Sequence, residues 1–224
     1  MKKILLLILL VYSSINAQVL YESVPSSKFN EPRNVKIQLP RNYEANEDKY
    51  YPVILVLDGD YLFEPVAGSA DYYSYWEDMP QAIIVGVMQP DRMEDTVYDD
   101  ANFLPTGQGA DFFEFLGMEL LPWLNKQYRL APFNVVVGHD ATAGFANYYL
   151  MKNPPLFNAY ISLSPDLAPQ MNERLTTILK QTEQQIFYYQ ATGTEDIPSL
   201  REETLALHQA LSGIENEKFH YYFD

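Results

Sequence analysis

The sequence contains no cysteine, and this absence excludes several kinds of chemistry. Without a thiol among its 224 residues, the chain forms no disulfide, holds no zinc through thiolates and has no cysteine nucleophile or lipid-modified N-terminal cysteine. Basic residues are also scarce, because 15 Lys and Arg stand against 30 Asp and Glu, for a formal net charge of −15. A chain this acidic repels a polyanion, so we expect no nucleic-acid partner.

The N-terminal segment has the layout of a secretory signal peptide. Lys2 and Lys3 precede a short apolar run over residues 4–11, and Ala17 offers a small residue for cleavage before Gln18. The run is shorter than the roughly 20 residues that a membrane-spanning helix needs. We therefore expect residues 1–17 to be removed on export to a bacterial periplasm or to the exterior, with no membrane partner after cleavage.

Residues 18–224 have the composition of one globular domain. Hydrophobic residues make up 47% and aromatic residues 14% of the chain, which is enough for a large core. Continuous apolar runs are typical of strands buried on both faces, as in a parallel sheet. We expect strands at 35–39, 51–57, 82–87, 134–138, 159–163, 186–191 and 218–223, and helices at 109–125, 143–151 and 199–212.

Strands come first and then alternate with helices, which predicts the α/β class, with a mostly parallel central sheet flanked by helices. Reactive groups in such a sheet gather beyond the carboxyl ends of its strands. The most informative strand end is the segment 135–144, VVVGHDATAG. A buried strand there ends in Gly138 and a helix follows, which is the setting of the G-x-S-x-G nucleophile elbow, with Asp140 in place of the serine.

Four stretches of the chain resemble the esterase D and ferri-siderophore esterase family of α/β-hydrolases. Each has a counterpart among the family's motifs, in the same order: L-P-x-x-Y, Y-P-V-x-Y-x-L-D-G, V-G-I followed by D-R, and S-P-S after the elbow. The matching segments are 33–43, 51–59, 85–92 and 157–166. From the family pattern we expect the α/β-hydrolase domain of residues 18–224 to be C-terminally truncated, lacking its last loop and helix.

The resemblance implies hydrolysis of small-molecule carboxylic esters by a Ser, acid and His triad, with no cofactor and no metal. Carried over residue by residue, the nucleophile position is Asp140, and the acid is Asp196 or its neighbour Glu195. The oxyanion donors would be the backbone N–H groups of Asp60 and Ala141. The histidine position is missing, because His139 precedes the elbow residue, His208 lies on a predicted helix and His220 lies inside the last predicted strand.

Three interpretations of Asp140 stay open at this point. It is a structural remnant that tolerates a strained backbone, in which case the protein is a non-catalytic, ligand-binding pseudo-esterase. Alternatively, its carboxylate is itself the nucleophile. In the third interpretation another hydroxyl, such as that of Thr142 or Ser164, takes over.

Two further segments each have a structural and a functional interpretation. An aromatic segment over residues 61–76 is either a packed cap over the sheet edge or a wall for a ring-bearing or glycan-like ligand. An acidic run over residues 91–100 is either a solvated loop or, if its oxygens converge, a cation site. The negative charge of the chain argues against an anionic ferric chelate as ligand.

Overall fold

A computed structural model describes residues 19–224 of the chain, so the predicted signal peptide lies outside the described residues. Eight strands form a single sheet in the order β1-β2-β4-β3-β5-β6-β7-β8. The strands are β1 (Val19–Val24), β2 (Arg33–Gln38), β3 (Tyr51–Val56), β4 (Ile83–Val87), β5 (Leu130–His139), β6 (Ala159–Leu163), β7 (Ile186–Ala191) and β8 (Phe219–Phe223).

All neighbouring strands from β3 onward, together with β4, pair in parallel. At one edge of the sheet, β1 pairs antiparallel with β2, and β2 pairs antiparallel with β4. The mostly parallel α/β sheet predicted above is therefore confirmed. The helices are α1 (Phe63–Tyr75), α2 (Arg92–Asp95), α3 (Gly107–Glu114), α4 (Leu121–Gln127), α5 (Ala141–Leu150), α6 (Met171–Gln181) and α7 (Pro198–Ser212), and a π-helix over Phe115–Leu120 joins α3 to α4.

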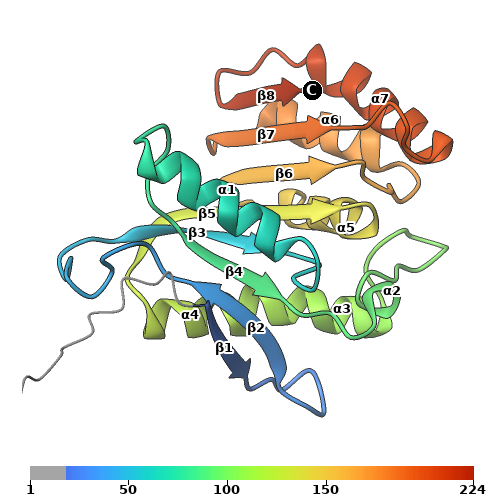
Figure 1. Ribbon diagram of the computed structural model, residues 1–224. Coiled ribbons are helices and arrows are strands. Elements are labelled where there is room, and N and C mark those ends of the chain that lie inside the picture. Colours follow the sequence, from blue (N-terminus) through green and yellow to red (C-terminus); the bar gives the residue numbers. More distant parts are fainter. Residues whose placement is uncertain (1–18) are drawn as a thin grey trace, which may run out of the picture.

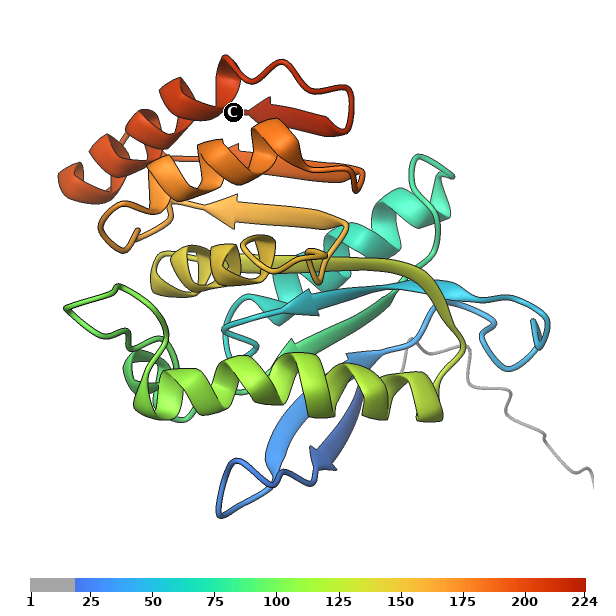
Figure 2. The ribbon, with the colours of Figure 1, turned by 180° about the vertical axis from the view of Figure 1, so that it is seen from behind.

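The helices cover the two faces of the sheet unequally. In Figure 1, α1 alone crosses the front of the sheet, and Figure 2 shows the other long helices on the opposite face. Two separate apolar clusters match these layers. The smaller cluster joins α1 to β3, β4 and β5 through side chains such as Phe63 and Val137, and the larger one lies under α3 to α7.

This asymmetry changes one expectation drawn from the apolar runs. All residues of β4 are buried, as expected for a strand covered on both faces. In β6 and β7, buried and half-buried residues alternate, and the half-buried residues of β6 lie at the border of the cluster under α1. Phe187 and Tyr189 are half-buried on that side of the sheet, so these two strands are fully covered on one face only among residues 19–224.

No helix within residues 19–224 combines the length and the apolar character that a membrane span requires.

Candidate active site

The carboxyl ends of the central parallel strands carry three strained residues. Asp58 follows β3, Asp140 follows β5 and Ser164 follows β6, and their φ angles are 55°, 57° and 45°. Positive φ is uncommon outside glycine and costs on the order of 1–3 kcal/mol per residue, so the surrounding contacts must hold it. Such strain concentrates at functional sites, which directs attention to this edge of the sheet.

Asp140 forms the tip of the turn between β5 and α5, with φ 57° and ψ −122°. Its N–H donates to the Leu163 carbonyl at 2.9 Å, and its own carbonyl accepts from Gly144 at 3.0 Å and from Asp166 at 3.1 Å. Small residues are required around this turn. A Cβ on Gly144 would lie 1.7 Å from the Asp166 carbonyl oxygen, and one on Gly138 would lie 2.7 Å from the backbone of Thr142.

Arg92, from the start of α2, reaches across to the elbow and neutralises Asp140. Its Nη1 donates to Asp140 Oδ2 at 2.9 Å and its Nη2 to the His139 carbonyl at 2.7 Å. Its Nε donates to Asp58 Oδ1 at 2.6 Å. Burial opposes the charge of Arg92, but the hydrogen bonds to Asp58 and Asp140 outweigh it and raise the pKa of the guanidinium. The Asp140 side chain is therefore one arm of a three-residue ion-pair network.

Asp58 is the buried centre of this network, with 2% of its surface exposed. Besides Arg92, its carboxylate accepts from Thr142 Oγ1 at 2.6 Å and from Tyr61 Oη at 3.1 Å. The Thr142 hydroxyl also accepts the His139 backbone N–H at 3.0 Å. Burial and the charge of Asp58 raise the pKa of Tyr61 to about 12, so this hydroxyl stays protonated and acts as a donor.

The predicted oxyanion donors lie on the two turns next to Asp140. Asp60 belongs to the turn after β3, and Ala141 is the first residue of α5, where a backbone N–H has no partner within the helix. Within residues 19–224, neither N–H donates a hydrogen bond to the protein. The Asp60 carboxylate accepts the Gln89 N–H at 3.1 Å and so fastens its turn to the end of β4.

The predicted acid residues after β7 have different surroundings. Asp196 accepts the Ser164 hydroxyl, the Thr192 hydroxyl at 3.3 Å and the Ile197 N–H at 2.8 Å. The hydrogen bond from Ser164 lowers the pKa of Asp196. Glu195 is exposed and makes no hydrogen bond to the described part of the chain. The structure thus links Asp196, and not Glu195, to the neighbouring strand end.

Within residues 19–224, none of the three histidines makes a hydrogen bond to the side chain of Asp140 or Asp196, although the charge of His139 contributes to lowering the pKa of Asp196. His139 Nδ1 pairs with Tyr61 Oη at 2.8 Å, His208 Nδ1 pairs with Tyr221 Oη at 2.9 Å, and His220 Nε2 pairs with Gln185 at 3.1 Å. His208 stacks on Phe223, and His220 stacks on Phe187. Residues 19–224 therefore contain no Ser-His-acid constellation at this edge of the sheet.

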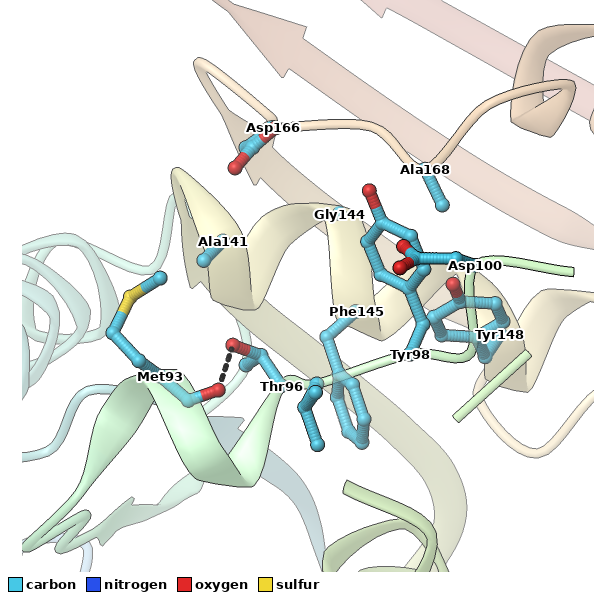
Figure 3. Close-up of a pocket in the computed structure, with 11 residues that line it drawn as sticks. Met93, Thr96, Tyr98, Asp100, Ala141, Gly144, Phe145, Tyr148, Asp166 and Ala168 are labelled. Atoms are coloured by element: carbon cyan, nitrogen blue, oxygen red, sulfur yellow. Dashed lines mark hydrogen bonds between the residues drawn. The ribbon is translucent and has the colours of Figure 1, made fainter. Parts of the chain in front are cut away.

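A cavity of about 310 Å³ opens beside the first turn of α5 (Figure 3). Ala141 and Gly144 form its side toward the elbow, and Asp166 lies above them. Tyr98 and Tyr148 lie together with Asp100 at the other end of the cavity. Ala141, the first residue of α5, thus lines the same cavity as a group of aromatic and acidic side chains.

The aromatic segment does not form the packed cap that was one of its two interpretations. Phe63 is buried, but Tyr72 is 59% and Trp76 61% exposed. The acidic run is also spread out. Asp91 caps α2, Asp95 is buried in a bidentate pair with Arg33, and residues 19–224 contain no cluster of metal-ligating side chains.

The Arg92 network is the main feature of this site that was not predicted from the sequence. In the sequence, Asp58 and Arg92 are noticeable only as parts of family motifs, and Thr142 only as a possible nucleophile. The sequence did contain a signal for this network. An arginine follows one strand closely, and aspartates follow two other strands. The carboxyl ends of parallel strands meet at one edge of the sheet, so these side chains could be expected to lie close together.

The comparisons with known proteins agree with this architecture. The sequence model of the family described as "Putative esterase" matches residues 26–215. A comparison with curated proteins found no match. A crystal structure of an uncharacterised protein from Capnocytophaga ochracea is 30% identical, with a TM-score of 0.85, and the match covers 92% of this chain and 57% of that protein. The chain thus spans little more than half the length of that relative.

Two other similar structures belong to proteins that are named for an activity. An IroE-like serine hydrolase from Shewanella oneidensis is 24% identical, with a TM-score of 0.78 and coverage of 92% of this chain and 73% of that one. The enterobactin esterase FES from Shigella flexneri is 19% identical, with a TM-score of 0.69 and coverage of 92% and 54%. At these identities the likeness shows the α/β-hydrolase fold. With the family match over residues 26–215, it follows that the chain belongs to the esterase family of α/β-hydrolases.

Proposed function

We propose that this protein is an exported member of the esterase family that binds a small ester-type ligand at the elbow without hydrolysing it by the serine mechanism. The observation that carries the proposal is the 2.9 Å contact between Arg92 Nη1 and Asp140 Oδ2. A carboxylate that is paired with a guanidinium is stabilised as an anion, and this stabilisation opposes its attack on an electrophile.

The surroundings of Asp140 support the same conclusion. A serine esterase needs a base that is hydrogen-bonded to its nucleophile, and no histidine within residues 19–224 makes a hydrogen bond to the Asp140 side chain. The features that would bind a ligand are nevertheless present. The Ala141 N–H is unpaired within residues 19–224, and Ala141 is one of the residues that line a cavity of about 310 Å³, a volume suited to a small ligand.

A kinetic experiment tests this proposal. We expect the purified protein to hydrolyse p-nitrophenyl acetate and butyrate no faster than a matched variant, Asp140→Asn, does. We also expect Asp140→Ser to show no gain, because the new hydroxyl would have no base. If the wild-type protein hydrolysed these esters and Asp140→Asn abolished the activity, the proposal would be contradicted.

A second candidate function has one observation in its favour. Asp140 Oδ1 makes no hydrogen bond to residues 19–224 and stands at a strained elbow next to two unpaired backbone N–H groups, so it is placed for attack on a carbon. In that reaction Oδ1 would displace a leaving group from an alkyl carbon, and water would then attack the carboxyl carbon of the enzyme ester. Single turnover in ¹⁸O-labelled water would place the label in Asp140, and mass spectrometry of the peptide detects it.

Export is supported by the N-terminal sequence alone. Lys2, Lys3, the apolar run over residues 4–11 and Ala17 fit a signal peptide, and we propose a periplasmic or secreted location. Mass spectrometry of the protein recovered from a bacterial periplasm should show Gln18 as the first residue. Recovery of the uncleaved chain with the cytoplasmic fraction would contradict export.

A further inference from the structure

We infer that the cavity beside Ala141 selects a small ligand that carries a positively charged ammonium group. The inference rests on the function proposed above, because it concerns the ligand of the same site. Its basis is the chemistry of the cavity wall, which combines unpaired carboxylates with aromatic rings and lacks any basic side chain.

The carboxylates of the wall have no partners of their own. Asp100 and Asp166 line the cavity and are both exposed, and neither carboxylate makes an ion pair or a hydrogen bond within residues 19–224. Burial and the nearby charge of Asp140 raise the pKa of Asp166. Glu203, which accepts the Leu167 N–H at 2.9 Å, has its pKa raised by burial and by Asp166 and Asp140. Because these anions destabilise one another, a bound cation would relieve their repulsion.

Two arginines act electrostatically on residues of the cavity wall, Arg92 on Asp166 and Arg174 on Tyr148, and both already have partners elsewhere. Arg92 is shared between Asp58, Asp140 and the His139 carbonyl. Arg174 donates to the Asn102 carbonyl at 2.9 Å. Burial raises the pKa of Tyr148, and the charge of Arg174 offsets part of this increase. An anionic ligand would therefore meet uncompensated negative charge in this cavity.

The aromatic part of the wall suits the same ligand. Tyr98 and Tyr148 lie side by side next to Asp100 (Figure 3), and Phe145 lies further along the wall. Ring faces attract cations, most strongly where water is excluded. The burial of Tyr98 and the charges of Asp166, Asp100 and Glu203 raise the pKa of its hydroxyl, which places the ring within the negative field of all three carboxylates.

This wall is preorganised, because the loop over residues 96–106 is held at several points. Thr106 N–H donates to the Val97 carbonyl at 3.2 Å, and Asp99 N–H donates to the Leu104 carbonyl at 2.9 Å. Tyr148 Oη donates to the Phe103 carbonyl at 2.9 Å. The loop packs so closely on α3 that a Cβ on Gly109 would lie 2.2 Å from the Val97 carbonyl oxygen. A fixed wall loses little entropy when a ligand binds.

The cavity is small, at about 310 Å³, near the lower limit for ligand sites. It therefore suits a ligand of the size of a choline ester or an amino-acid ester. In such a ligand the ammonium group would face Tyr98 and Asp166, and the carbonyl oxygen would accept the Ala141 N–H.

Titration calorimetry with two esters of the same shape tests the inference. Acetylcholine carries the charge, and 3,3-dimethylbutyl acetate is its neutral isostere. We expect acetylcholine to bind about tenfold more tightly than the isostere. Asp166→Asn should weaken acetylcholine binding by about threefold or more without affecting the isostere, while Asp48→Asn, which changes an exposed aspartate outside the cavity lining, should affect neither.

The outcomes separate this inference from the function on which it rests. Equal affinity for the two esters would contradict the ammonium selectivity. It would still be consistent with the proposed binding of an ester ligand at the elbow. Absence of binding by either ester would overturn the inference. If the protein hydrolysed both esters and Asp140→Asn abolished this activity, the proposed function would be contradicted. In that case a tenfold lower KM for acetylcholine than for the isostere would still support the charge selectivity.

Discussion

Nη1 of Arg92 lies 2.9 Å from Oδ2 of Asp140, so the residue at the tip of the elbow is one half of an ion pair. The side chains of Arg92 and Asp140 are 27% and 28% exposed, whereas Asp58, which shares the same guanidinium, is almost completely buried. Arg92 therefore neutralises a buried carboxylate and a partly exposed one at the same time, and both would be left unpaired without it.

Replacing Arg92 with methionine should destabilise the protein. The variant leaves Asp58 buried without its counter-ion, and we expect the free energy of unfolding to fall by about 2–4 kcal/mol. Urea denaturation measures this change. Arg41→Met is the matched control, because the Arg41–Asp71 pair is much more exposed, and its loss should cost less than about 1 kcal/mol. Equal effects of the two substitutions would contradict the role assigned to Arg92.

Gly144 and Gly68 should respond in opposite ways to alanine. In Gly144→Ala the new Cβ would lie 1.7 Å from the Asp166 carbonyl oxygen, so backbone must move, and we expect a loss of about 3 kcal/mol or more. Gly68 lies within α1, and a Cβ added there would meet no neighbouring atom within 4 Å. Gly68→Ala should therefore raise the free energy of unfolding by about 0.5–1 kcal/mol. Thermal unfolding of both variants checks the two signs.

Thr142 stabilises the elbow through its hydroxyl. Thr142→Val keeps the shape of the side chain but removes the 2.6 Å hydrogen bond to Asp58 and the acceptor of the His139 N–H. We expect a loss of about 1–3 kcal/mol, because the His139 N–H loses this acceptor and the buried Asp58 carboxylate loses one of its donors. Thr142→Ser, which retains the hydroxyl, should recover most of this difference in urea denaturation. If the valine variant were as stable as the wild type, the hydroxyl would have no such role.

The Asp196 carboxylate should stabilise the folded protein at pH values above 3.8, the ordinary pKa of an aspartate. This stabilisation should be lost in acid. The Ser164 hydroxyl lowers the pKa of the folded-state carboxylate, so the folded protein releases this proton more readily than the unfolded chain does. The stabilisation is therefore complete above pH 3.8 and disappears as the pH falls through the lowered value. The stability difference between wild type and Asp196→Asn should shrink as the pH falls from about 6 to about 3.

The control for this pH dependence is Glu195→Gln, which changes an exposed neighbouring carboxylate without hydrogen bonds to residues 19–224. We expect its pH profile to follow that of the wild type. Ser164→Ala removes the donor and should flatten the profile as Asp196→Asn does. A profile of Ser164→Ala that matches the wild type would argue against the Ser164 hydrogen bond as the cause.

The central strands could be predicted because their apolar runs are long and end sharply. The bounds predicted for β6 and β7 agree with Ala159–Leu163 and Ile186–Ala191. Four elements were not predicted, namely β1, α1, α2 and α6. β1 contains polar residues at an exposed edge and gives no apolar run. α6 buries Met171, Leu175 and Leu179, and this four-residue spacing is a signal from which the helix could have been predicted.

The position of the elbow was also predictable, since a buried strand followed by small residues is a local pattern. The ion pair at its tip was not, because Asp58, Arg92 and Asp140 come from three separate loops whose meeting point depends on strand order and register. Whether Asp140 and Asp196 act in catalysis is still a prediction. The structure adds which side chains each of them contacts.

The convergence of Thr142, Tyr61 and Arg92 on the Asp58 carboxylate has a consequence for how substitutions at this site combine. A single substitution at Asp140 leaves a guanidinium without one of its partners, so the effect of that substitution depends on which residues already occupy positions 58, 92 and 142. Substitutions at these four positions are therefore coupled, and their effects on stability should not add.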